Sequence, residues 1–376
     1  AGQQRQGLGD AGRRAAQADA SPPADDSICN PARLPAERAD DVCNQCHLSN
    51  VPQVLRYGRR HSDFRPGDRL ADIWLTFPQV EPTSPAAGDG AVQAVSHVWQ
   101  THSSRCYQQS QGELRCVSCH DPHGIPDDRS RVAFFDSKCL KCHSTESCGL
   151  PPPQRAAPPA DGSCIGCHMP RLPAADVPHT TQTDHRIPRN SGHARRLNTP
   201  TTAPANTPRP TFEGVPAWEV ERGRALLAAQ QAEHERSPAL ARQVLEQIAP
   251  LSAIVADDAE LLDARAICRL LAGQRPDAIH DWERLLALDP QRLSALQSLL
   301  GVHMEAGETT RAVGYAERLA TLQPHQADVL LQAAVLAERL GRFEQAAELI
   351  ERAWRLNPAS AAIRARRAAL RDGAAP

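Results

Sequence analysis

The sequence predicts a mostly α-helical and irregular protein in two parts, a cysteine- and histidine-rich N-terminal part followed by a C-terminal α-solenoid. Two observations lead to this prediction. Four Cys-x-x-Cys-His motifs lie between residues 43 and 168, and a 34-residue period runs through the C-terminal part. Residues 194–216 separate the two patterns and are rich in Pro and Thr, which is typical of a semi-rigid, extended linker.

Composition and charge limit what the rest of the chain can do. Residues 1–28 contain almost no large apolar side chain, so we expect an extended tail without a core of its own. The whole chain has 42 basic and 44 acidic residues, a balance that gives no indication of a nucleic-acid partner. No apolar run approaches the roughly 18 residues that a membrane-spanning helix needs. We therefore expect neither a nucleic-acid partner nor a membrane span.

The four motifs read CNQCH, CVSCH, CLKCH and CIGCH. A zinc site or a redox dithiol can use Cys-x-x-Cys, but neither requires a histidine directly after the second cysteine. Covalent c-type haem attachment does require it, because the cysteines form thioethers to the porphyrin and the histidine binds the iron. Histidine makes up only 15 of the 376 residues, so four coincidences are improbable. We expect four covalently attached c-type haems, held by Cys43, Cys46, Cys116, Cys119, Cys139, Cys142, Cys164 and Cys167, with His47, His120, His143 and His168 as proximal ligands.

Residues 29–193 contain few large apolar side chains, so the polypeptide alone can bury little core there. We expect a haem-cored, tetrahaem cytochrome c domain in which the porphyrins supply the missing apolar material. Covalent haem attachment takes place outside the cytoplasm in bacteria, so we expect a periplasmic or extracellular protein whose signal peptide has been removed. A disulfide among Cys29, Cys106 and Cys148 is compatible with such an oxidising compartment, and its pairing is not deducible. Cys268 is expected to be a small buried residue on a helix.

The second axial ligand of each iron separates an electron carrier from an enzyme with an open site. Methionine is unsuited to this role here, since Met169 directly follows its own proximal histidine and Met304 lies in the helical part. Histidine is abundant instead, and bis-histidine ligation predicts low reduction potentials. The proposed distal ligands are His97, His123, His179 and His185, with His102 and His61 in reserve. His123 is too close to its own motif to reach round to that iron, so we expect it to serve a neighbouring haem.

Several segments resemble a group of bacterial multihaem c-type cytochromes fused to tetratricopeptide repeats. The resemblance is carried by "SRCYQQSQGELRCVSCHDPHG", "KCLKCHSTESCGLP", "CIGCHMPR" and "HTTQTDHRIPR", over roughly residues 29–190, and by the C-terminal repeats. It implies that His123, His179 and His185 are distal ligands, and "SHVWQ" adds His97. Relatives often carry further haem motifs upstream, where this chain has the tail 1–28.

The repeats can be read directly from residues 34 apart. Gly273, Gly307 and Gly341 keep this step, as do three prolines, three alanines and two sets of leucines. Thirty-four residues is the length of a tetratricopeptide repeat, a pair of antiparallel helices. We expect this domain over residues 217–376, with a degenerate first unit at 217–256 and a capping helix at 359–372 that has an arginine-rich outer face. His234, His280, His303 and His325 are expected to be surface or packing residues.

The leading functional hypothesis is extracytoplasmic electron transfer through four low-potential haems. In it the repeats dock redox partner proteins or further copies of the chain, and a non-closing contact through the tail and repeats would build a haem-lined filament. A simpler alternative is that the repeats only brace the haem domain. The enzymatic alternative is a multihaem oxidoreductase with one open iron that reduces nitrogen oxides or sulfur oxyanions. Such enzymes often mark that iron with a motif ending in lysine, and none of the four motifs does, so an enzyme is not the expectation.

Overall fold

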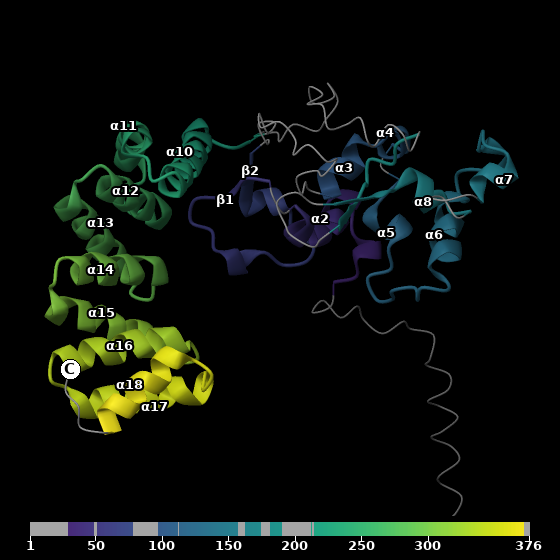
Figure 1. Cartoon of the computed structure of the whole chain (residues 1–376). Helices are drawn as coiled ribbons and strands as arrows, with labels where there is room; N and C mark the ends of the chain where they lie inside the picture. The colour runs from purple at the N-terminus through teal and green to yellow at the C-terminus, as the bar shows by residue number, and fades with distance from the viewer. Residues whose placement is uncertain are drawn as a thin grey trace, which may run out of the picture. The chain divides into compact units, whose positions relative to one another are not determined.

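The structure is a computed structural model of the chain, and it describes residues 29–48, 51–77, 97–111, 113–156, 162–173, 181–189, 212 and 214–371 (Figure 1). The tail 1–28, most of the linker 194–216 and His179 lie outside the described residues. The chain divides into two compact units. Unit 1 comprises residues 1–51, 61–73 and 78–209, and unit 2 comprises residues 52–60, 74–77 and 210–376.

Unit 1 is built from short elements joined by irregular segments. Its two longest described helices are α2 (Ala36–His47) and α6 (Arg131–Cys139). Strands β3 (Arg171–Pro173) and β4 (Thr181–Thr183) pair in antiparallel register, with Leu172 opposite Gln182. The remaining elements are η1 (Pro31–Arg33), η2 (His61–Asp63), η3 (Leu70–Asp72), α3 (His97–Ser103), α4 (Arg105–Gln109), α5 (Cys116–Cys119), η4 (Thr145–Ser147), α7 (Pro152–Arg155) and α8 (Cys164–His168).

The polypeptide core of unit 1 is small. Among its described residues the buried apolar side chains are Ala39, Phe64, Leu70 and Ile73. In the described parts of residues 97–189 the buried side chains are polar, whereas apolar ones such as Val117 and Leu140, inside two of the motifs, are exposed. This distribution agrees with the expectation that residues 29–193 do not bury a sizeable core with their own side chains.

Unit 2 contains an α-solenoid whose helix boundaries repeat every 34 residues. The helices α12, α14, α16 and α18 begin at Ala259, Leu293, Ala327 and Ala361. The second helices of the pairs, α13, α15 and α17, keep the same step. The full ranges are α10 (Ala217–His234), α11 (Pro238–Ile254), α12 (Ala259–Leu271), α13 (Arg275–Leu288), α14 (Leu293–Glu305), α15 (Thr309–Leu322), α16 (Ala327–Arg339), α17 (Phe343–Leu356) and α18 (Ala361–Arg371). The predicted period, the first helix pair and the C-terminal helix are thus present.

The repeating glycines stand where the chain turns between the two helices of a pair. Gly273, Gly307 and Gly341 have φ of 85°, 73° and 73°, in the left-handed region that a helix C-terminus commonly adopts and that glycine reaches without strain. The repeating alanines Ala278 and Ala312 are fully buried, so the second helix of each pair can approach its neighbours closely. These side chains join one continuous apolar core that runs from α12 to α18.

A short hairpin from the N-terminal half of the sequence belongs to unit 2. Strand β1 (Gln53–Leu55) pairs antiparallel with β2 (Trp74–Thr76). Val54 and Phe77 pack in one apolar cluster with Val220 of α10. The sequence predicts a repeat domain that starts at residue 217, so the structure extends this unit by a segment whose apolar side chains pack against α10.

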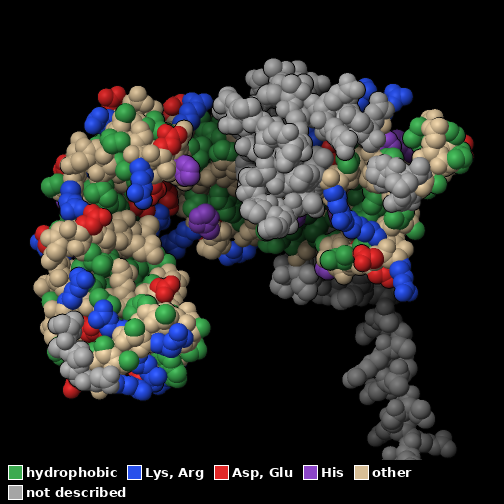
Figure 2. All heavy atoms as spheres, viewed as in Figure 1, with side chains coloured by type: hydrophobic (Ala, Val, Ile, Leu, Met, Phe, Trp, Pro, Cys, Tyr) green, Lys and Arg blue, Asp and Glu red, His purple; other side chains and the backbone are tan. Residues whose placement is uncertain are grey.

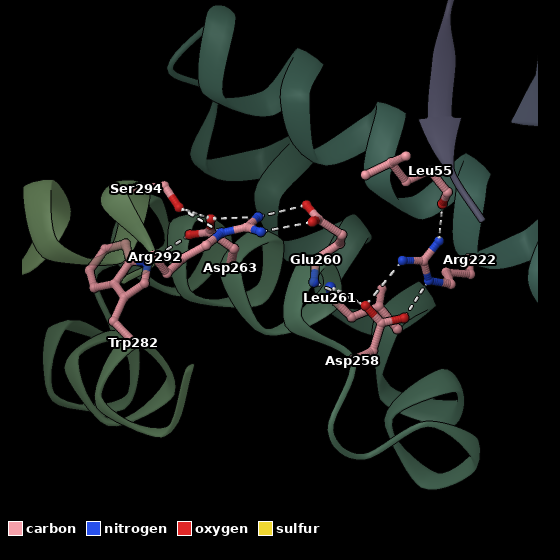
Figure 3. Close-up of polar contacts among 9 residues, drawn as sticks. All are labelled: Leu55, Arg222, Asp258, Glu260, Leu261, Asp263, Trp282, Arg292 and Ser294. Carbon is pink, nitrogen blue, oxygen red and sulfur yellow. Dashed lines mark hydrogen bonds and ion pairs between the residues drawn. The ribbon is translucent and has the colours of Figure 1, made fainter. Parts of the chain in front are cut away.

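One buried and one partly exposed ion pair connect the first helices of unit 2 (Figure 3). Arg222 and Asp258 form a salt bridge in which both side chains are almost completely buried, and Arg222 Nη1 also donates to the Leu55 carbonyl at 2.7 Å. Arg292 binds Glu260 through two hydrogen bonds, at 2.9 and 2.8 Å. Nearby, Asp263 accepts hydrogen bonds from Trp282 and Ser294.

Several arginines of α18 form ion pairs with the helices that precede it. On the face shown in Figure 2, acidic and basic side chains are interspersed, and basic ones gather where α18 ends the solenoid. Arg366 pairs with Glu338, and Arg367 and Arg371 both pair with Glu351. The arginine-rich face predicted to point outward is therefore partly occupied by contacts that attach the capping helix to α16 and α17.

Candidate functional site

Each Cys-x-x-Cys-His motif forms one helical turn. Numbered in chain order, motif 1 (residues 43–47) ends α2, and motif 4 (residues 164–168) forms α8. In motif 2 the His120 amide donates to the Cys116 carbonyl at 2.9 Å, and in motif 3 the His143 amide donates to the Cys139 carbonyl at 3.0 Å. Residues at i, i+3 and i+4 share one face of a helix, so both thiols and the imidazole of a motif are presented to the same side. The spacing of the motif therefore suits one planar group held at three points.

Two motif histidines and two of the proposed distal histidines form a cluster. The ring centres of His47 and His97 are 5.8 Å apart, and those of His120 and His185 are 6.2 Å apart. His97 and His185 lie beside each other, with ring centres at 4.6 Å. Burial, together with His185, His47 and His120, lowers the pKa of His97 to about 4. The lowered pKa keeps the His97 imidazole neutral at physiological pH, the form in which histidine binds metals.

Two histidines of the site have one ring nitrogen fixed by a backbone carbonyl. His168 Nδ1 donates to the Pro188 carbonyl and His185 Nδ1 to the Thr183 carbonyl, both at 2.9 Å. Such a bond selects the tautomer whose Nε2 carries a lone pair, the arrangement usual for a metal-bound imidazole. Both rings are therefore prepared to bind through Nε2.

The segment that follows β4 is shaped by a buried carboxylate. Asp184, which is 1% exposed, accepts hydrogen bonds from the backbone and guanidinium nitrogens of Arg186 at 2.8 to 2.9 Å. The His185 amide donates to Gln100 Oε1 at 2.7 Å. Ile187 has φ of 51°, an uncommon conformation for a β-branched residue that costs about 1–3 kcal/mol. These contacts attach His185 to α3, which also carries His97.

The other predicted ligands are placed separately. His123 is exposed, and its amide donates to Asp121. His102 stacks on Tyr107, with ring centres 4.2 Å apart, and burial lowers its pKa. The reserve ligand His61 lies exposed on η2. His143 is exposed, and His179 lies outside the described residues.

The cysteines outside the motifs are free thiols in the structure. Cys29, Cys106 and Cys148 are each partly buried and are not joined to one another. Cys106 lies near the second cysteines of motifs 2 and 3, Cys119 and Cys142. Cys268 is fully buried on α12, which confirms the prediction of a small core residue. In unit 2 His303 is also buried and stacks on Tyr315, whereas His234, His280 and His325 are exposed.

Two aspartates not singled out from the sequence connect the motifs. Asp136 Oδ1 accepts a hydrogen bond from the Cys164 amide at 3.0 Å, and the Asp40 carboxylate lies beside the amide and the thiol of Cys116. Burial, with the charge of Asp40 as the next contribution, raises the pKa of Cys116 to about 12. Both aspartates stand three residues before the first cysteine of a motif, a regularity that is visible in the sequence.

The residues present fit a c-type haem. Each motif presents two thiols and an imidazole on one helical turn, and non-motif imidazoles face two of the motif histidines. The scarcity of buried apolar side chains in the described part of unit 1 matches a segment that packs around large apolar groups. Cys43, Cys46 and His47, and their counterparts in the other motifs, are the residues that would hold the four groups.

The helix pairs define the C-terminal part as an α-solenoid of the tetratricopeptide type, on its own geometry. No protein-family model matches the chain, and no curated protein matches its sequence. Among solved structures, a MamA fragment from Desulfovibrio magneticus RS-1 is 16% identical and covers 42% of this chain and 86% of its own, with a TM-score of 0.35. PilF from Pseudomonas aeruginosa is 17% identical and covers 42% and 71%, with a TM-score of 0.34. Matches this weak carry no argument about function.

No helix in the part of the chain that the structure describes is long and apolar enough to cross a membrane.

Proposed function

We propose that this protein transfers electrons through four covalently bound c-type haems outside the cytoplasm. The observation that carries the proposal is the grouping of the motif histidines His47 and His120 with the non-motif histidines His97 and His185. A histidine surplus that merely served the surface would not be expected to converge on two motifs. The compartment follows from covalent attachment, which takes place outside the cytoplasm in bacteria.

The ring separations support a specific pairing of axial ligands. Two imidazoles on opposite sides of one metal ion, each bound at about 2 Å, have ring centres roughly 6 Å apart. The separations of His47 from His97 and of His120 from His185, 5.8 and 6.2 Å, are close to this value. We assign His97 to the haem of motif 1 and His185 to the haem of motif 2.

Haem iron supplies a one-electron couple whose potential depends on its axial ligands, its burial and nearby hydrogen bonds. The chain would contribute the imidazoles that hold the iron, and its own hydrogen bonds fix those imidazoles. The Pro188 carbonyl fixes His168, while the Thr183 carbonyl and Gln100 fix the residue His185. Two nitrogen ligands without methionine favour low potentials.

The solenoid of unit 2 is proposed to dock protein partners, either redox proteins or further copies of the chain. Stacked helical repeats expose an extended surface on which partners commonly bind. Polymerisation through the tail 1–28, which would build a haem-lined filament, is a special case of this proposal.

Low-temperature EPR of the oxidised protein, combined with a haem count, tests the proposal. We expect four haems per chain, all low-spin, because each iron is proposed to have two imidazole ligands. A chain without covalent haem contradicts the proposed function. A stoichiometric high-spin signal would contradict the carrier and favour the oxidoreductase with one open iron.

A further inference from the structure

The four motifs occur in two alternating settings. In motifs 1 and 3 the first cysteine lies at the end of a helix, at Cys43 near the end of α2 and at Cys139, the last residue of α6. In motifs 2 and 4 the first cysteine begins a short helix, at Cys116 of α5 and Cys164 of α8. The structural environment thus repeats with a period of two motifs.

An aspartate connects motif 1 to motif 2, and another connects motif 3 to motif 4. Asp136, on α6, lies one turn before Cys139 and accepts the hydrogen bond of the Cys164 amide at 3.0 Å. Asp40, on α2, lies one turn before Cys43, and its carboxylate lies beside the backbone amide and the thiol of Cys116. Arg115 adds an ion pair to Asp40 at 3.9 Å.

The cysteines beside these aspartates also meet. The thiols of Cys43 and Cys116 lie beside each other, as do those of Cys139 and Cys164. The thiol hydrogens are lost when thioethers form, but the contacts of the backbone amides with the carboxylates do not depend on them. The attachment points of motifs 1 and 2, and those of motifs 3 and 4, are therefore neighbours.

The acidic residue alone does not make the contact. An acidic residue stands three positions before the first cysteine of every motif, at Asp40, Glu113, Asp136 and Asp161. Glu113 is exposed and precedes α5, so it is not on a helical turn with Cys116. Asp161 lies outside the described residues. Among the described acidic residues, a carboxylate on the preceding helical turn therefore distinguishes motifs 1 and 3 from motif 2.

We propose that the four haem sites form two structurally equivalent pairs, motif 1 with motif 2 and motif 3 with motif 4, and that Asp40 and Asp136 are the positioning residues that join each pair. The histidine cluster independently brings motifs 1 and 2 together, since His47 and His120 both lie in it. Cys106 lies near both Cys119 of motif 2 and Cys142 of motif 3, so these two motifs are also neighbours. The haem sites are therefore arranged in the order of their motifs in the sequence, and electron exchange is expected to be closest within each pair.

This inference rests on the proposed function, and its test uses the full-length haem-loaded protein. The variants Asp40→Ala and Asp136→Ala are compared with Glu113→Ala, which removes an acidic side chain at the equivalent position. Haem occupancy of each motif is measured by mass mapping of the haem-bearing peptides, and the reduction potentials by a spectroelectrochemical titration resolved into four steps. The wild-type haem count decides the proposed function separately from the outcome for the variants.

We expect Asp136→Ala to lower the occupancy of motifs 3 and 4 or to shift two potentials, and Asp40→Ala to act on the other two. Asp136→Asn and Asp40→Asn keep an oxygen acceptor for the amide and should restore most of the loss, which also tests the idea if the alanine variants fold poorly. Glu113→Ala should leave all four sites unchanged. Effects spread evenly over the four sites, or equal effects of Asp136→Ala and Glu113→Ala, would overturn the pairing.

Discussion

Arg222 and Asp258 form a buried ion pair that connects α10 to the N-terminus of α12 and, through the Leu55 carbonyl, to the hairpin of unit 2. Asp258 also caps α12, because its Oδ1 accepts from the amides of Glu260 and Leu261 at 3.0 and 3.1 Å. One carboxylate therefore satisfies a buried cation and a helix N-terminus at once (Figure 3).

Replacing Asp258 by alanine should destabilise unit 2 strongly. The change leaves Arg222 buried without its counter-charge, which costs about 3–5 kcal/mol. The adjacent Asp257→Ala is a matched control, since its ion pair with Arg284 is exposed and is worth less than about 1 kcal/mol. Urea denaturation followed by the helical circular dichroism signal measures both. Similar losses in the two variants would contradict the role given to the buried pair.

Gly223→Ala should destabilise the contact between α10 and the hairpin. An added Cβ would lie 2.4 Å from Phe77 Cζ and 3.1 Å from Val54 Cγ2, and overpacking of this kind costs about 1–3 kcal/mol. Gly301→Ala on α14 meets nothing within 4 Å and should stabilise its helix by up to about 1 kcal/mol. The two alanine substitutions should therefore change the free energy of unfolding in opposite directions, which thermal or urea denaturation can check.

Glu219 should make the stability of unit 2 sensitive to acid. Burial alone would raise the pKa of Glu219, but hydrogen bonds from Arg56 and the Tyr57 amide lower it below its usual value. A carboxyl whose folded pKa is lowered contributes stability above its unfolded pKa of about 4.3, and this contribution is lost as the pH falls through the folded pKa.

The variant Glu219→Gln should accordingly lose about 1–3 kcal/mol at pH 7 and differ little from wild type at the acid end of the transition. Glu221→Gln is the control, because Glu221 forms an exposed pair with Arg224. Denaturation curves recorded from pH 7 downward compare the three proteins. A loss for Glu219→Gln that does not diminish with acidification would contradict the assignment.

His97→Ala and His185→Ala should each open one iron. Removal of one axial imidazole converts a six-coordinate low-spin haem into a high-spin one, so EPR should show one high-spin centre in each variant. The double variant should show two, because the histidines are assigned to different motifs. His61→Ala should remain low-spin. A single high-spin centre in the double variant would show that both histidines serve the same haem.

Much of unit 2 could be predicted from the sequence because its information is local. The helix starts at Ala259, Leu293 and Ala327 follow the period that glycine and proline already mark. The hairpin could not be assigned to this unit, since each strand has three residues and its partner α10 follows some 140 residues later in the sequence. Apolar strands this short give no sign of the surface they cover.

Some residues of the candidate site can likewise be predicted from local sequence, whereas others depend on long-range contacts. Motif spacing alone predicts the cysteines and proximal histidines of the proposed haem sites, because each motif is contained within five residues. The proximity of His97 and His185 depends on the long-range bond between Gln100 and the His185 amide, which no local pattern encodes. The roles of Asp40 and Asp136 depend on whether a helix precedes or follows the cysteine. Because all four motifs have an acidic residue three positions before the first cysteine, the sequence alone does not show which of these residues lie on a helix.

The hairpin and the helix that covers it lie far apart in the sequence, which affects the order in which they are synthesised. Its strands are translated before three of the four Cys-x-x-Cys-His motifs, whereas α10, against which they pack, is translated after all of them. A gene fusion at the linker 194–216 would therefore separate Val54 and Phe77 from Val220 and expose them in the chimaera. Both segments must therefore be inherited together for this contact to form, and during synthesis the apolar side chains of the hairpin stay uncovered until α10 has been made.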